Sequence, residues 1–134
     1  FNPEFQNSVL VLKLYPSLNP SLLSRFNLSD IKVVIIEAFG SGNMPIKGSF
    51  DMLPFIEKCL AESKHVIVTS QAAYDSVDLS LYKSGRAARE LGAISAGDMT
   101  MEAAVTKSMH LLSLDLAEND FKLQFEKSIA GERS

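Results

Sequence analysis

The sequence has few of the residues that disulfides, metal sites and nucleic-acid surfaces require. Among its 134 residues are one cysteine, two histidines, and 13 lysines and arginines against 16 aspartates and glutamates, for a net charge of −3. A lone cysteine cannot form an internal disulfide, so a reducing compartment is expected. The acidic balance argues against a nucleic-acid partner, which would need clustered basic side chains. No apolar run approaches the roughly 20 residues of a membrane-spanning helix, so no membrane partner is expected.

The cysteine and the histidines also lack the spacing of a metal site. His65 opens a predicted strand, His110 lies in a late predicted helix, and Cys59 lies among apolar neighbours in another. Because this spacing matches no zinc motif, we predict neither a metal ion nor another cofactor. The thiol is predicted to be buried and unreactive, and the histidines to be ordinary core-edge or surface residues. The chain also has no dinucleotide fingerprint, Walker loop or Gly-x-Ser-x-Gly elbow.

Apolar runs that alternate with helical patterns make up most of the chain. Hydrophobic residues account for 46% and charged residues for 22%, which excludes a disordered chain, and the length suits a single domain over residues 1–134. Near-continuous apolar strands between helices predict a three-layer α/β/α sandwich with a four-stranded parallel sheet. Strands are expected at residues 9–14, 31–38, 65–69 and 93–95. Helices are expected at 20–26, from Ser49 or Asp51 to Ser63, at 81–91, after a cap at Asp98 or Thr100, and at 118–129.

The most informative local feature is a glycine-spaced turn directly after the second predicted strand. Gly40 and Gly42 can adopt positive φ and bring bare backbone close to a partner. Asn43 follows them and offers one amide acceptor and two amide donors. Open α/β sheets bind ligands at the carboxyl ends of their strands, so the turn indicates a ligand-facing loop. A tight connection that serves the fold alone is the alternative.

A second polar loop, residues 70–82, also follows a predicted strand. It supplies polar groups at Tyr74, Asp75, Asp78 and Tyr82. Their pattern is typical of a solvated loop with turn-forming aspartates, and equally of a second edge of a ligand site.

Four segments of the chain are more informative together than alone. They are Glu37–Pro45, Val68–Gln71, Leu81–Gly85 and Leu91–Ala104, with further matching positions at 106–107 and 129–132. In this order they resemble the C-terminal domain of the L-asparaginase (asparaginase/glutaminase) family, on its type I, cytoplasmic side. The resemblance covers the chain from about residue 9 to residue 132. It implies a flavodoxin-like α/β sandwich in a protein that forms homo-oligomers.

The reaction of that family is the hydrolysis of L-asparagine to L-aspartate and ammonia. The resemblance implies that the nucleophilic threonine lies in a Gly-Gly-Thr motif of a separate N-terminal domain, with a Thr-Asp pair and a lysine. This chain has no Gly-Gly pair, and its three threonines precede Ser70, Met101 and Lys107 rather than an aspartate. An activated hydroxyl needs a base and an oxyanion-stabilising group beside it. We therefore predict no catalytic residue here and expect the chain to be inactive alone.

What the resemblance implies instead is the rim of an active site. In the family that site forms between the N-terminal domain of one subunit and the C-terminal domain of its neighbour, and these are the expected partners. Asn43, in a turn built by Gly40 and Gly42, is the expected substrate-facing residue, and Tyr82 is a second one. The Asn43 amide would orient the head group of a small amino-acid amide, or hold the neighbouring catalytic loop.

The chain departs from the family pattern at three points. Pro45 stands where periplasmic-type relatives carry a second asparagine, and the loop before Tyr82 lacks their glutamate. Ala72 and Ala73 stand where some type I enzymes use a cysteine to bind regulatory asparagine. Regulation of that kind is therefore not expected here.

Two alternatives stay open. The chain could be a non-catalytic interaction or assembly module that keeps the asparaginase scaffold. It could also belong to a glutaminase or a transfer-RNA amidotransferase, although the acidic balance weighs against an RNA-facing domain.

Overall fold

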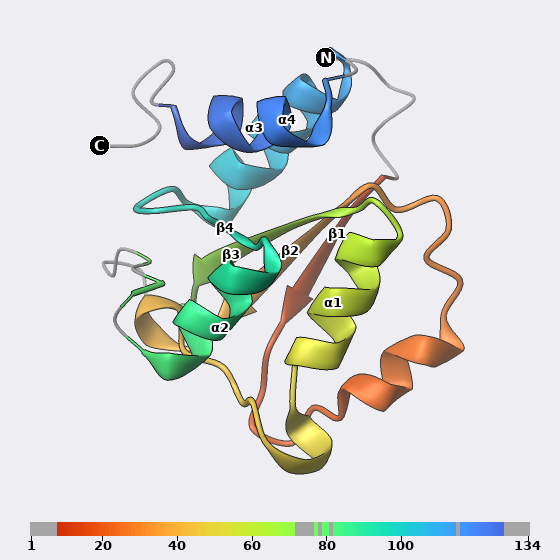
Figure 1. The fold of residues 1–134 in the computed structure, drawn as a ribbon, viewed down its shortest axis with the longest axis vertical. Coiled ribbons are helices and arrows are strands. Elements are labelled where there is room, and N and C mark those ends of the chain that lie inside the picture. Colours follow the sequence, from red (N-terminus) through yellow and green to blue (C-terminus); the bar gives the residue numbers. More distant parts are fainter. Residues whose placement is uncertain (1–7, 72–76, 78, 81, 115, 128–134) are drawn as a thin grey trace.

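Four parallel strands form one sheet at the centre of the computed structural model (Figure 1), which describes residues 8–71, 77, 79–80, 82–114 and 116–127. Strand β2 pairs with β3 from Val33 opposite His65 to Ala38 opposite Ser70. The strand order is β1-β2-β3-β4, the order of the chain itself. The strands are β1 (Val9–Lys13), β2 (Val33–Ala38), β3 (His65–Ser70) and β4 (Ile94–Ser95).

One face of the sheet is covered by the elements that connect successive strands. These are η2 (Pro20–Arg25), α1 (Leu53–Ala61) and α2 (Lys83–Leu91), and Figure 1 shows them together below the sheet. Crossovers between parallel strands are right-handed, so a sheet that grows in one direction carries all of them on one face. The core on this side contains alternate residues of the central strands, including Val34, Ile36, Val66 and Val68.

Helices α3 (Met101–Leu112) and α4 (Glu118–Glu126) cover the opposite face. They enclose the strand residues that point the other way, including Val33, Ile35, Ile67 and Ile94. In α4, Phe121 and Phe125 are one turn apart and both are buried. The predicted three-layer α/β/α sandwich with a four-stranded parallel sheet is therefore confirmed.

Helix ends follow local chemistry. The Thr100 hydroxyl accepts a hydrogen bond from the Ala103 amide at 3.1 Å, so Thr100 rather than Asp98 caps α3. Helix α2 ends at Gly92, which has a φ of +120°. A glycine adopts that conformation without the steric penalty of a side chain.

Three predicted boundaries differ from the observed ones. Residues 20–25 form a 3-10 helix rather than an α-helix. Helix α1 begins only at Leu53, because residues Gly48–Phe50 form a separate 3-10 turn, η4, and the Asp51 carboxylate then accepts from the Leu53 amide at 2.9 Å. Strand β2 begins two residues later than expected. The predicted end of the last helix at residue 129 lies outside the described residues. Among the residues described, no helix is long and apolar enough to cross a membrane.

Candidate functional site

The loop after β2 is closed on itself by backbone hydrogen bonds. The Phe39 amide donates to the Asn43 carbonyl at 2.9 Å, and the Asn43 amide donates back to the Phe39 carbonyl at 3.0 Å. Between them, Gly40–Gly42 form one 3-10 turn, η3. The loop therefore holds Asn43 at a fixed place beyond the carboxyl end of β2.

Gly42 lets this loop pack closely on the segment that follows β3. Its φ is +97°, and a Cβ atom at this position would lie 3.0 Å from Val77 Cγ1 and 3.3 Å from Leu79 Cδ2. A side chain at residue 42 would meet both an unfavourable backbone conformation and a crowded contact. The expected need for glycine at this position has a structural basis in these contacts.

Asn43 is joined to the start of α2 by a side-chain hydrogen bond. The Ser84 hydroxyl donates to Asn43 Oδ1 at 2.9 Å and accepts from the Met44 amide at 3.2 Å. Ser84 is only 4% exposed, whereas the Asn43 side chain is exposed. The structure thus brings together two segments, Glu37–Pro45 and Leu81–Gly85, that lie about 40 positions apart in the sequence.

The start of α2 is held in place by close backbone packing. A Cβ atom at Gly85 would lie 2.7 Å from the Leu79 carbonyl oxygen and 2.9 Å from Leu79 Cα. Backbone atoms cannot move aside as a flexible side chain can, so residue 85 has to be glycine for this approach. Since Ser84 is the adjacent residue, this packing fixes the position of its hydroxyl.

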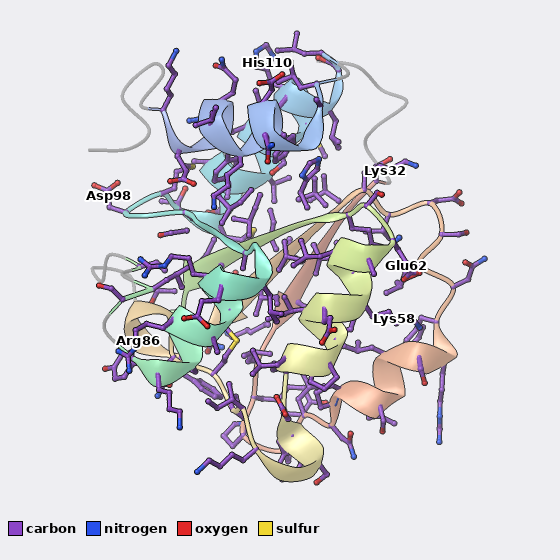
Figure 2. All side chains as sticks on the ribbon, in the orientation of Figure 1. Lys32, Lys58, Glu62, Arg86, Asp98 and His110 are labelled. Atoms are coloured by element: carbon purple, nitrogen blue, oxygen red, sulfur yellow. The ribbon has the colours of Figure 1, made fainter. Side chains whose placement is uncertain are left out.

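Tyr82 lies at the same edge of the sheet, immediately before α2. It is the N-cap residue of that helix, its side chain is 40% exposed, and its carbonyl accepts from the Arg86 amide at 3.0 Å. Figure 2 shows Arg86 near the start of α2, where its guanidinium donates to the Ser80 carbonyl at 3.0 Å. Tyr74, Asp75 and Asp78, the other polar residues noted in this loop, lie outside the described residues.

Gln71 supports the edge in a way that the sequence does not predict. Its Nε2 donates to the Glu37 carbonyl at 2.9 Å and to the Leu14 carbonyl at 2.6 Å, and its backbone amide donates to the Ala38 carbonyl at 3.0 Å. One side chain after β3 therefore ties together the ends of β1 and β2. The only sequence signal is a polar residue directly after a strand.

The described residues at this edge provide binding groups rather than a nucleophile. The Ser84 hydroxyl and the Thr69 hydroxyl are both buried and both donate to protein oxygen atoms, to Asn43 Oδ1 and to the Ile36 carbonyl. A hydroxyl committed in this way is not poised to attack a substrate. Within the described part of the chain, no three histidine, cysteine, aspartate or glutamate residues lie together as a metal site would require.

A separate groove of about 650 Å³ lies between η2, η4 and α1. Its apolar wall includes Leu23, Phe26 and Cys59, while Lys58 and Glu62 line it from α1 (Figure 2). Cys59 is 2% exposed, and burial away from water raises the pKa of its thiol from an ordinary 9.0 to about 11. The predicted burial of this thiol is confirmed. The groove itself arises from the packing of η2 on α1, which the sequence does not reveal.

The fold and the loop geometry together define a parallel α/β/α domain with a polar, glycine-built edge. The chain belongs to the glutaminase/asparaginase C-terminal domain family, whose model matches residues 8–125. The resemblance seen in the sequence is thereby confirmed.

Relatives of the chain are longer proteins. The L-asparaginase of Thermococcus kodakarensis is 37% identical over 132 residues, which are 98% of this chain and 39% of that protein. A solved structure described as the thermostable L-asparaginase from Thermococcus kodakarensis matches with a TM-score of 0.86 and 36% identity, over 100% of this chain and 40% of that one. One of the polypeptides of the glutamyl-tRNA(Gln) amidotransferase of Thermoplasma acidophilum is 32% identical over 98% of this chain and 31% of that protein. The chain therefore spans about 40% or less of the length of these relatives.

Proposed function

We propose that this chain is the C-terminal domain of an L-asparaginase, which hydrolyses L-asparagine to L-aspartate and ammonia. In this proposal the chain supplies the rim of the active site, and the groups that break the amide bond belong to an N-terminal domain outside residues 1–134. The observation that carries the proposal is the exposed Asn43 amide, which Ser84 holds at the carboxyl end of β2. A preorganised polar group at this edge suits substrate positioning.

The partners in this proposal are the N-terminal domain of the same protein and that of a neighbouring subunit in a homo-oligomer. The strand order supports a shared site, because strands that run in chain order form no crevice at a reversal point. A ligand at this edge would need a second surface. We also propose a cytoplasmic location, which the single, buried thiol of Cys59 supports.

The test uses the full-length protein with Asn43→Ala. We expect kcat/KM for L-asparagine to fall about 10- to 100-fold, the range of a lost positioning contact, with an unchanged melting temperature. Asn119→Ala is the matched control, because Asn119 is an exposed asparagine on α4, which covers the opposite face. Unchanged kinetics in a normally folded Asn43→Ala variant would reject the rim function.

A second candidate is a domain of an amidotransferase that uses another amide. The similarity to the Thermoplasma acidophilum glutamyl-tRNA(Gln) amidotransferase polypeptide, at 32% identity over 98% of the chain, favours it. Ammonia release from L-asparagine and from L-glutamine, measured side by side on the full-length protein, distinguishes the two. A non-catalytic assembly module would release ammonia from neither.

A further inference from the structure

The Ser84 hydroxyl determines which way the Asn43 amide faces. A serine hydroxyl carries one hydrogen, and the Met44 amide, which can only donate, occupies one of its lone pairs at 3.2 Å. The single hydrogen is then directed to Asn43 Oδ1 at 2.9 Å. With the amide reversed, the same hydroxyl would face two donors, and its hydrogen would have to find another acceptor in a site that is 4% exposed.

The atoms that hold this arrangement are fixed from both sides. Met44 is 4% exposed, so its backbone amide is anchored by a buried side chain. Ser84 is anchored through Gly85, whose approach to the Leu79 backbone leaves no room for a shift of α2. The oxygen of the Asn43 amide is therefore turned toward the protein, and its two Nδ2 hydrogens are left for a ligand.

We infer that Ser84 is a positioning residue that presents the Nδ2 hydrogens of Asn43 to the α-carboxylate of an amino-acid substrate. This rests on the proposed function and names the substrate group that the rim binds. An amide nitrogen donates and cannot accept, so its partner must be an acceptor oxygen. The bond to Ser84 also places Asn43 beside the first turn of α2, where the helix N-terminus and the exposed Lys83 favour a negative charge.

Four variants of the full-length enzyme test this inference. Ser84→Ala removes the bond and is expected to raise KM for L-asparagine about 3- to 10-fold, with kcat within about twofold. Ser84→Thr keeps the hydroxyl and is expected to restore KM to within about twofold. Asn43→Asp keeps an acceptor for Ser84 but replaces the outward donors with an anion, so KM is expected to rise about 10- to 100-fold. The fourth, Asn43→Ala, serves the inhibitor test, and melting temperatures confirm folding.

Competitive inhibitors distinguish a substrate carboxylate from an acceptor oxygen of a neighbouring protein loop. β-Alanine is L-aspartate without its α-carboxylate. If Asn43 binds that group, Asn43→Ala weakens inhibition by L-aspartate about tenfold and leaves inhibition by β-alanine unchanged. An equal loss for both inhibitors would assign the amide to loop holding and overturn the inference.

The orientation itself has a test that does not depend on activity. Outward Nδ2 hydrogens exchange rapidly with solvent in ¹⁵N-resolved NMR of the full-length protein. Protected Nδ2 hydrogens that become unprotected in Ser84→Ala would show the reversed amide and overturn the inference, whether or not asparagine is cleaved. Absence of asparaginase activity in the wild-type protein, with rapid exchange at Asn43, would instead reject the proposed function and leave the orientation standing. Unchanged KM in a folded, active Ser84→Ala enzyme would overturn the positioning role alone.

Discussion

The side chain of Gln71 reaches across β2 to the carbonyl of Leu14, to which it donates at 2.6 Å. On the way it donates a second hydrogen bond to Glu37, so that the ends of three strands share one amide. The loops of the candidate site leave the sheet at this place. The rigidity of the rim therefore depends in part on a residue that itself binds no ligand.

Replacement of Gln71 by glutamate is expected to destabilise the protein. The variant has nearly the same shape, but a carboxylate cannot donate and would face two carbonyl oxygens. We expect the free energy of unfolding to fall by about 1–3 kcal/mol in denaturant titrations. Gln124→Glu on α4 is the matched control, because no described strand carbonyl binds that side chain, and it should remain within about 0.5 kcal/mol of wild type. Equal stability of the two variants would contradict the role of Gln71.

Two glycines with positive φ should differ in their tolerance of alanine. Gly42 and Gly48 have φ values of +97° and +67°, but only Gly42 has neighbours that a Cβ would meet, at Val77 and Leu79. Gly48→Ala is expected to cost about 1–2 kcal/mol, the penalty of a left-handed backbone alone. Gly42→Ala adds overpacking and should cost about 1–3 kcal/mol more. Thermal unfolding of both variants measures this difference, and a smaller loss for Gly42→Ala would contradict the packing described for the loop.

The Cys59 thiol predicts a specific dependence of stability on pH. Its pKa is about 11 in the folded protein, because burial disfavours the thiolate, against an ordinary value of 9.0. A raised pKa means that the folded state favours the protonated thiol. This contribution is fully present below pH 9 and is lost as the pH rises toward 11.

The comparison with Cys59→Ala isolates that contribution from other groups that titrate at high pH. Unfolding free energies of both proteins, measured at pH 8 and at pH 10.5, should show a steeper decline for the wild type. Alkylation of the thiol should also be slow at pH 8. A parallel decline of both proteins would mean that Cys59 does not titrate differently in the folded and unfolded states.

The ring of His65 stacks on Phe121 with centroids 3.7 Å apart and an interplanar angle of 7°. Because Phe121 is also 1% exposed, Phe121→Leu should lower the free energy of unfolding by about 1–2 kcal/mol through lost area and lost stacking. Leu123→Ala, two residues away at 65% exposure, should change it by less than about 0.5 kcal/mol. Similar losses in chemical denaturation would show that α4 is not anchored through Phe121.

Much of the fold can be predicted from the sequence because local pattern and burial agree. The run at β2 is apolar at almost every position, and only a strand covered on both faces has that pattern. The segment at η2 is less clear, since six residues with a proline at the start suit a 3-10 turn as well as an α-helix. Its hydrogen bonds depend on how it packs against α1, and the sequence does not contain that information.

The site divides in the same way. Asn43 and its glycines can be identified because the turn and its place after a strand are contiguous in sequence. Ser84 and Gln71 act on that turn from distant segments, and only tertiary packing shows which carbonyl or amide each one meets. The groove beside Cys59 also depends on packing, since its walls come from three separate elements.

A sheet whose strands never reverse order presents a shelf rather than a pit. A shelf contacts a small molecule from one side only, so the opposite wall has to be brought by another folded body. Any affinity measured at this shelf should then depend on how firmly the two bodies are joined. Dilution of an enzyme built in this way is expected to lower its turnover per active site before any part of it unfolds.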